Sequence, residues 1–356
     1  HIFNQAQTRF TGTIGESTPL QSITTNSSST VVLADADGSV GTGTIYVNDD
    51  ITFKGPVLLE HNATIDGASG QIEFRSTVDS ATSIDMDLTF NNVANATITF
   101  GAAVGSTNRL KKIQIISSNN STVHFNTSEV LSKRNQRYGS DIVINSPTNI
   151  LLIDISVGGT LKLGSEGANN TILSEVDGEE TLKLVTPGVI SLFSIVGDNN
   201  QTLNDFTIES TSTSLLYNDI STTGVQTYDG NLALAADVIL TAGILDFRNT
   251  VDNGGQNLTL SPNSFVLNQG AFTGSGNLVK EGAGDFPVNV VSTLTGNVII
   301  NQGSIINSMN VENAFPNAAS FFLGDGTSSA LGHDTTDVFT LVSGQSLSGL
   351  GTCDCV

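Results

Sequence analysis

Tryptophan is absent from this chain of 356 residues, tyrosine occurs only four times, and charged residues make up only 13% of the sequence. A typical globular protein has about 25% charged residues, and helices use Glu, Lys and Arg to keep their outer faces soluble. The shortage of those residues argues against a helical protein. The shortage of aromatic side chains argues against a groove that binds polysaccharide by stacking, and so against the polysaccharide lyases and hydrolases that share β-helical folds.

Long apolar runs and a cysteine framework are also missing. No run of 18 apolar residues occurs, so we predict no membrane span. The only cysteines, Cys353 and Cys355, are separated by one residue, a spacing too short for an easy mutual disulfide. We therefore expect no disulfide framework and no zinc site. The chain opens at His1 inside a strand-like pattern, as expected for a mature fragment whose export signal has been removed.

The residues that are abundant favour strands and turns. The chain contains 36 Gly, 34 Asn and 81 Ser plus Thr. Thr, Val and Ile suit strands, whereas Gly, Asn, Asp and Ser suit tight turns. The formal net charge of −21 would repel a duplex nucleic acid or an anionic membrane. We therefore predict an all-β protein with many turns and no nucleic-acid partner.

Internal repeats carry the strongest signal in the sequence. Three blocks begin at Phe10, Phe100 and Phe193, and each has one large apolar residue ten positions later and another three positions after that. Segments 72–79 and 245–252 are identical at five of eight positions. Residues 1–270 are therefore interpreted as about three copies of a unit of roughly 90 residues. A distinct segment follows at 271–356.

Within each copy, short runs alternate between apolar and polar residues and are bounded by Gly, Asn, Asp or Ser, as in 97–100 and 257–260. Alternation places one set of side chains inside and the other outside. A sandwich or barrel fits this local pattern too, but a long tandem repeat favours a β-solenoid with stacked coils. Asn, Ser and Thr at equivalent turns are expected to stack as ladders. The only helical signal is a short turn at 127–134.

The repeats resemble a known family of surface proteins. The run 223–230 (TGVQTYDG), followed by 240–243, 247–252 and 257–260, is similar to the filamentous-haemagglutinin-type repeats of large bacterial surface proteins. The C-terminal runs 276–284 and 295–303 resemble the autotransporter-associated β-strand repeat, and 342–352 resembles the end of such a repeat. These resemblances imply a right-handed parallel β-helix, exported to the bacterial cell surface, with no catalytic residue and no cofactor.

Chemical site signals are weak. The histidines His1, His61, His124 and His333 are too far apart in sequence to suggest metal ligands. Paired carboxylates occur at Asp35 and Asp37, Asp85 and Asp87, and Glu179 and Glu180. The runs at 35–38 and 325–326 resemble fragments of calcium loops without the full ligand set. Turn chemistry accounts for these acidic residues, so we predict no catalytic, metal or cofactor site.

One cluster of basic residues stands out in an acidic chain. Six of the 13 basic residues fall between positions 109 and 137, namely Arg109, Lys111, Lys112, Lys133, Arg134 and Arg137. They form either a solvated face of a few coils or a docking patch for an acidic neighbouring subunit or surface polymer. They are our candidate interface.

We predict two alternative functions, which belong to different classes. The first is a structural subunit of an extracellular filament or sheath that assembles head to tail through open solenoid ends. The second is an adhesin rod that binds a host or mineral surface, with residues 133–159 as an irregular binding loop. An enzyme acting on polysaccharide is a third and less favoured reading.

Overall fold

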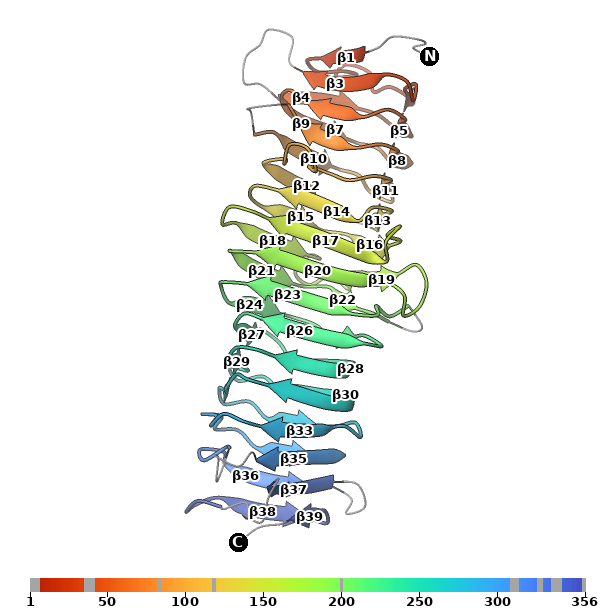
Figure 1. The fold of residues 1–356 in the computed structure, drawn as a ribbon. Coiled ribbons are helices and arrows are strands. Elements are labelled where there is room, and N and C mark those ends of the chain that lie inside the picture. Colours follow the sequence, from red (N-terminus) through yellow and green to blue (C-terminus); the bar gives the residue numbers. More distant parts are fainter. Residues whose placement is uncertain are drawn as a thin grey trace. The chain divides into compact units, whose positions relative to one another are not determined.

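The structure, a computed structural model, describes residues 7–34, 42–81, 85–116, 120–198, 201–307, 314–324, 329–333 and 341–353. In these ranges every helix or strand element is a β-strand, and the strands stack in parallel as the coils of a β-solenoid (Figure 1). The prediction of an all-β solenoid is confirmed. The chain divides into two compact units, unit 1 (His1–Ser194) and unit 2 (Ile195–Val356).

Unit 1 has three faces, because each coil contributes strands to three stacks. Face 1 contains β2 (Ile23–Thr24), β5 (Ile51–Phe53), β8 (Gln71–Phe74), β11 (Thr97–Phe100), β13 (Thr122–Phe125), β16 (Asp141–Ile144) and β19 (Thr171–Ser174). Face 2 contains β1 (Gln7–Thr11), β3 (Thr30–Ala34), β6 (Val57–Leu59), β9 (Val78–Ser80), β14 (Glu129–Ser132), β17 (Ile150–Ile155) and β20 (Thr181–Thr186). Face 3 contains β4 (Thr42–Tyr46), β7 (Asn62–Asp66), β10 (Asp87–Asn91), β12 (Lys112–Ile116), β15 (Gln136–Tyr138), β18 (Thr160–Leu163) and β21 (Val189–Leu192).

An aromatic ladder fills the interior behind face 1 of unit 1. Phe53, Phe74, Phe100 and Phe125 are register partners on successive strands, and all four are fully buried. The centroids of neighbouring rings lie 5.3, 5.4 and 5.7 Å apart, and the last two pairs are stacked. Strand alternation produces the ladder because every second residue points inward. Burying one such ring contributes about 1.5–3 kcal/mol, so the ladder binds coil to coil.

The expected turn of helix at 127–134 is wrong. Residues Glu129–Ser132 form β14, which pairs in parallel with β17, and Val130 is fully buried opposite Ile153. A single helical turn is marginal in isolation. Pairing with the neighbouring coil therefore overrides the local preference.

Unit 2 also has three stacks. Its face 1 contains β22 (Ile195–Val196), β25 (Ile220–Ser221), β32 (Leu278–Lys280), β34 (Val298–Ile300), β36 (Ser320–Leu323) and β38 (Ser346–Gly349). Its face 2 contains β23 (Phe206–Ser210), β26 (Val225–Asp229), β33 (Asp285–Val288), β35 (Gly303–Asn307), β37 (Ser329–His333) and β39 (Thr352–Cys353). Its face 3 contains β24 (Ser214–Leu216), β27 (Leu232–Leu234), β29 (Val251–Asp252) and β31 (Phe272–Thr273). The long strands β28 (Val238–Phe247) and β30 (Leu258–Asn268) turn a corner and belong to both face 1 and face 2.

Coil length is constant through much of unit 2. The inward residues Ile220, Leu240, Leu260, Lys280 and Ile300 are register partners and follow one another at intervals of 20 residues. This regularity brings the same turn position of each coil directly above the last.

A ladder of Asp and Asn side chains uses that regularity. Asp237, Asn257, Asn277 and Asn297 occupy one corner of successive coils. The Oδ1 atom of each accepts a hydrogen bond from the backbone N–H of the next, at 2.7, 3.3 and 3.0 Å. Each bond satisfies a backbone donor that the turn would otherwise leave unpaired. The expectation that Asn stacks at equivalent turns is confirmed.

The sequence repeat of roughly 90 residues is not a whole number of coils. Phe10 opens the first block from β1 on face 2 of unit 1, whereas Phe100 opens the second from β11 on face 1. Leu20 and Leu110 differ in the same way, because Leu20 bridges to Val47 beside β4 and Leu110 bridges to Ser132 on β14. Each copy therefore starts one face away from the copy before it.

Candidate interaction surface

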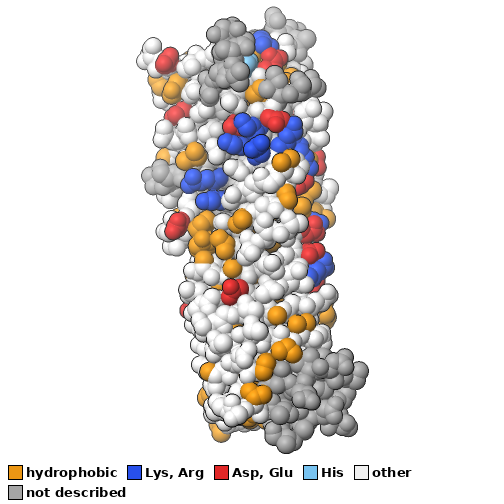
Figure 2. All heavy atoms as spheres, turned by 90° about the vertical axis from the view of Figure 1, so that its left-hand side faces the viewer, with side chains coloured by type: hydrophobic (Ala, Val, Ile, Leu, Met, Phe, Trp, Pro, Cys, Tyr) orange, Lys and Arg blue, Asp and Glu red, His pale blue; other side chains and the backbone are white. Residues whose placement is uncertain are grey.

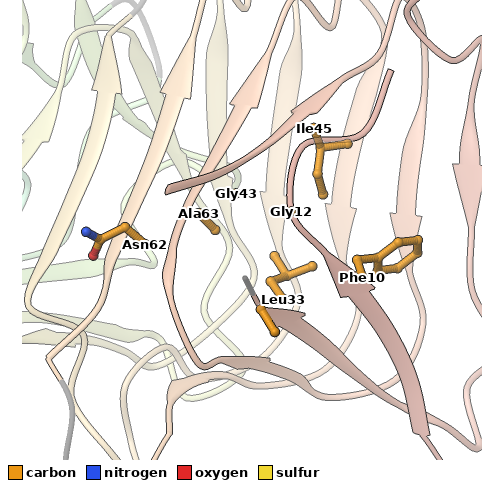
Figure 3. Close-up of a pocket in the computed structure, with 8 residues that line it drawn as sticks. Phe10, Gly12, Leu33, Gly43, Ile45, Asn62 and Ala63 are labelled. Atoms are coloured by element: carbon orange, nitrogen blue, oxygen red, sulfur yellow. The ribbon is translucent and has the colours of Figure 1, made fainter. Parts of the chain in front are cut away.

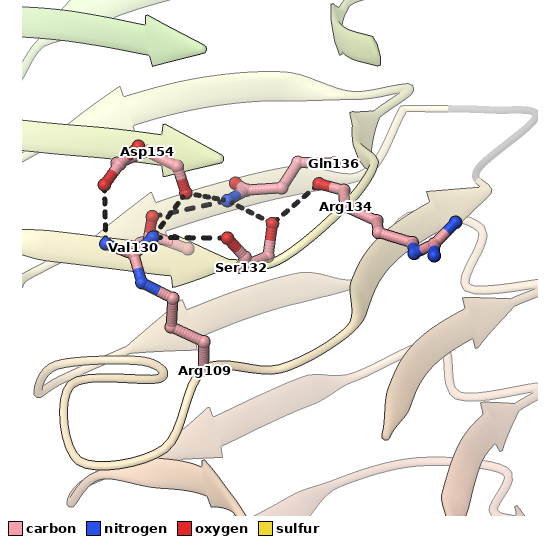
Figure 4. Close-up of polar contacts among 6 residues, drawn as sticks. All are labelled: Arg109, Val130, Ser132, Arg134, Gln136 and Asp154. Atoms are coloured by element: carbon pink, nitrogen blue, oxygen red, sulfur yellow. Dashed lines mark hydrogen bonds and ion pairs between the residues drawn. The ribbon is translucent and has the colours of Figure 1, made fainter. Parts of the chain in front are cut away.

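Arg109 is tied to its own unit. Its guanidinium donates hydrogen bonds to Asp154 Oδ2 at 2.6 Å, to the Ser132 carbonyl at 3.2 Å and to the Asp154 carbonyl at 3.4 Å. Ser132 lies on β14 and Asp154 on β17, and Figure 4 shows the Arg109 side chain reaching these two strands from the turn before β12. Arg109 thus connects that turn to face 2, which is a structural role.

A buried polar network lies beside it, at the corner between β14 and β15 (Figure 4). The Gln136 amide donates to the carbonyls of Val130 (3.3 Å) and Asp154 (3.1 Å), and to Ser132 Oγ at 3.0 Å. Tyr138 OH donates to Gln136 Oε1 at 2.7 Å. Burial raises the pKa of the Tyr138 phenol far above its ordinary value, so the hydroxyl stays protonated and remains a donor.

The same network recurs 90 residues later in unit 2. Gln226 donates to the carbonyls of Ile220 (3.1 Å) and Thr241 (2.8 Å), and Tyr228 OH donates to Gln226 Oε1 at 2.7 Å. The sequence signal was a Gln-x-Tyr triplet in two copies, 136–138 and 226–228, which our sequence analysis did not pair. Its role is to satisfy the corner carbonyls, so it is a structural site.

Lys112 and Lys133 have carboxylate partners. Lys112 Nζ lies 3.8 Å from Asp87 Oδ2, and Lys133 Nζ forms an ion pair with Asp85. The acidic pair at Asp85 and Asp87 is therefore opposed by bases. Exposed ion pairs of this kind contribute about 0–1 kcal/mol.

The other three candidates are different. Lys111, Arg134 and Arg137 have no ion-pair partner among the residues that the structure describes. Arg137 is in register with Lys162 on β18, which is exposed and also lacks a partner in the described ranges. Our sequence analysis missed Lys162, because 25 residues separate it from Arg137 and only the coil register brings the two together. Figure 2 shows Lys and Arg side chains gathered on the side of the molecule where β12, β15 and β18 lie in Figure 1.

Other candidate groups form no chemical site. Within the described ranges no group of three or more His, Cys, Asp or Glu side chains is placed to hold a metal ion. His1, Asp35, Asp37, Asp325 and Cys355 lie outside the described residues, as do the side chain of His333 and both calcium-loop fragments. His61 lies in the turn before β7, and His124 lies on β13. Burial raises the pKa of the Glu180 carboxyl, beside Glu179.

The expectation for the cysteines is wrong in one respect. Cys353 is disulfide-bonded, and the only other cysteine of the chain is Cys355.

A lysine inside unit 2 was also missed. Lys280 is fully buried among the inward row of face 1, and its Nζ donates to the carbonyls of Glu281 (2.6 Å), Gly282 (2.7 Å) and Gln302 (3.3 Å). Gly303, at φ +75°, leaves room for it, since a Cβ there would lie 2.7 Å from Nζ. Burial lowers the pKa of Lys280 to about 8, against the raising effect of Asp285 and Glu281.

The structure thus defines a parallel β-solenoid with structural polar networks and a basic surface that has no ion-pair partner among the described residues. No family model matches the chain, and neither the curated proteins nor the solved structures contain a match. The resemblance to surface-protein repeats therefore stays a prediction. In the described part of the chain, no helix is long and apolar enough to cross a bilayer.

Proposed function

We propose that this chain is a structural subunit of an extracellular, cell-surface filament that grows by adding parallel strands at its end coils. One observation carries the proposal: the outermost described strands pair on one side only. In unit 1, β1 pairs with β3 and β2 pairs with β5; in unit 2, β38 pairs with β36 and β39 pairs with β37. An unpaired strand edge is a template for another strand.

A small hollow also lies near β1. Phe10, Leu33, Ile45 and Ala63 line a small hollow at the first coil of unit 1 (Figure 3). An apolar side chain from an added coil would fill it and would gain about 0.8 kcal/mol for each CH₂ group buried. Strand addition at this edge therefore combines backbone hydrogen bonds with continued core packing.

The register of β1 supplies a precise test. Gly12 N–H bonds to the Ala34 carbonyl, and Thr11 is in register with Ala34. Because donors alternate sides along a parallel strand, the N–H of Thr11 points away from β3, to the free edge. Thr11→Pro therefore removes an edge donor without breaking a bond inside the chain, and proline is tolerated at such edges.

Electron microscopy of the purified chain tests the proposal. We expect filaments from the wild type and from the control Thr11→Ala, and loss of filaments from Thr11→Pro at an unchanged unfolding temperature. Wild-type protein that stays monomeric at high concentration contradicts the proposal, as do filaments of normal length from Thr11→Pro. Release of sugars from acidic or neutral polysaccharides would instead support an enzyme.

A second proposal, an adhesin rod, has support from a different region. Residues 133–159 are not the irregular loop expected, because β15, β16 and β17 lie there in regular pairing. One of the longest intervals between register partners in unit 1 runs from Leu151 to Leu182, and the turn within it exposes Val176. Replacing 175–179 by a short Gly-Ser turn should abolish attachment to a target surface and leave filaments intact; retained attachment counts against an adhesin.

A further inference from the structure

Four basic side chains form an unneutralised surface on unit 1, here called the basic face: Lys111, Arg134, Arg137 and Lys162. They occupy three successive coils, since Arg134 N–H bonds to the Lys111 carbonyl at 2.9 Å and Arg137 is in register with Lys162. Three of the four are exposed and Lys111 is half-buried. None has an ion-pair partner among the described residues.

This arrangement is unfavourable in an isolated subunit. Neighbouring strands lie about 4.8 Å apart, and like charges directly opposite each other on adjacent strands are destabilising. The chain has 34 acidic residues with which to neutralise 13 basic ones, and nearby bases such as Lys133 and Lys112 do have partners. A bound anionic surface would relieve the repulsion between Arg137 and Lys162.

Unit 2 has the complementary charge. Residues 195–356 contain 15 Asp and Glu but only two bases, Arg248 and Lys280. Both bases are occupied within unit 2, because Arg248 pairs with Asp229 and Asp246 and Lys280 is buried. Unit 2 therefore has a net charge of −13, and Arg248, its exposed base, already pairs with Asp229 and Asp246.

Two exposed carboxylates of unit 2 lie on adjacent coils, as the bases of the basic face do. Asp219 and Asp237 are both exposed, and Asp219 Oδ1 accepts from Ile239 N–H on the next coil at 2.7 Å. The two carboxylates are diagonal neighbours, since Ile220 is in register with Leu240 and Asp219 therefore stands opposite Ile239, two residues after Asp237. A second copy of this chain thus offers carboxylates on neighbouring coils to bases on neighbouring coils, about one strand spacing apart in each solenoid.

We propose that the basic face of unit 1 docks against the Asp219 and Asp237 surface of unit 2 in a second copy of this chain, which joins filaments side by side. The inference rests on the proposed function and adds to it the contact that makes a sheath or bundle from single filaments. Complementary charges chiefly fix register and speed association, so the contact should weaken steeply with salt. An acidic polysaccharide on the same face is the competing outcome.

The experiment uses the Thr11→Pro chain, in which end-to-end growth is blocked. Its self-association is measured by sedimentation equilibrium at about 0.01 M and at about 1 M salt. Between these two conditions the Debye length falls from about 30 Å to about 3 Å. We expect self-association at low salt and its loss at high salt. Adding Arg134→Gln, Arg137→Gln and Lys162→Gln should weaken association at least tenfold. The matched control, Arg9→Gln, Lys54→Gln and Arg75→Gln, removes three bases elsewhere and should change it less than about threefold.

The acidic partner is tested in the same way. Asp219→Asn with Asp237→Asn keeps the Oδ1 acceptors and removes both charges, so it should also weaken association at least tenfold. Asp198→Asn with Asp252→Asn, two exposed carboxylates elsewhere in unit 2, is the control.

Three results overturn the inference: no self-association at low salt, equal losses in the basic-face variant and its control, or binding of polygalacturonate without self-association. Its failure is distinct from failure of the proposed function. Filaments that form but never associate sideways in micrographs contradict only the side-by-side contact, whereas sideways dimers without filaments contradict only strand addition.

Discussion

The two units build the same fold in different ways. In unit 1 the inward register partners Phe53, Phe74, Phe100, Phe125 and Ile144 are separated by unequal intervals, and the interior is held by stacked rings. In unit 2 the corresponding interval is a constant 20 residues from β25 to β34, and an Asp and Asn ladder runs along one corner. Packed rings also run through unit 2, from Phe206 to Phe286. Both units thus share an aromatic interior, and equal coil intervals add a turn ladder to it in unit 2.

The first and largest expected effect concerns the aromatic ladder of unit 1. Phe100→Ala removes the ring that stacks on both Phe74 and Phe125, and we expect a loss of about 3–5 kcal/mol in the free energy of unfolding. Denaturant unfolding monitored by hydrogen exchange resolves the loss unit by unit. A loss below about 1 kcal/mol would show that the rings are not what holds unit 1 together.

The second concerns the interior of unit 2 and its pH dependence. Burial lowers the pKa of Lys280 from its ordinary value of 10.5 to about 8 in the folded chain, so between these two pH values the unfolded chain binds more protons. Stability should therefore rise with pH across this window, by up to about 1.4 kcal/mol per pH unit, and the destabilising contribution should be fully present below pH 8. Lys280→Met should abolish the rise, and a variant that keeps it would exclude Lys280 as the source.

The third prediction tests whether the buried Gln and Tyr network contributes equally to stability in the two units. Tyr138→Phe and Tyr228→Phe each leave a buried glutamine oxygen without its donor, which costs about 1–3 kcal/mol. Because the hydrogen-bond lengths are equal, we expect equal losses in parallel thermal and denaturant unfolding measurements. Clearly unequal losses would mean that the surrounding coils, and not the local motif, determine how much this hydrogen bond contributes to stability.

The fourth and smallest effect concerns the turn ladder. Asn277→Ala removes the acceptor for Asn297 N–H, and we expect a cost of about 0.5–1.5 kcal/mol. Asn277→Asp keeps the acceptor and serves as the control. Asn135→Ala provides the comparison in unit 1, because Asn135 Oδ1 accepts from Thr160 N–H at 3.0 Å outside any such ladder. A larger loss of unfolding free energy in Asn135→Ala than in Asn277→Ala would show that the ladder adds no cooperative stability.

Much of the fold could be predicted, because alternation and repetition are local properties of a sequence. Even the burial of Lys280 follows from alternation, since it shares the parity of Leu278. The basic surface could be predicted only in part. Which bases keep partners depends on register: Arg109 meets Asp154 across 45 residues, and Arg137 meets Lys162 across 25. Because the number of residues per coil varies in unit 1, the sequence pattern within one strand does not predict which residue lies opposite it on the next coil.

The offset between the sequence repeat and the coil has an evolutionary consequence. A duplication of this length advances by a fractional number of turns, as Phe10 on face 2 and Phe100 on face 1 demonstrate. Any surface feature copied with the repeat would therefore lie on a different face of the solenoid in each copy. Growth by tandem duplication could in this way spread one adhesive or docking feature around the circumference without any new side chain having to evolve.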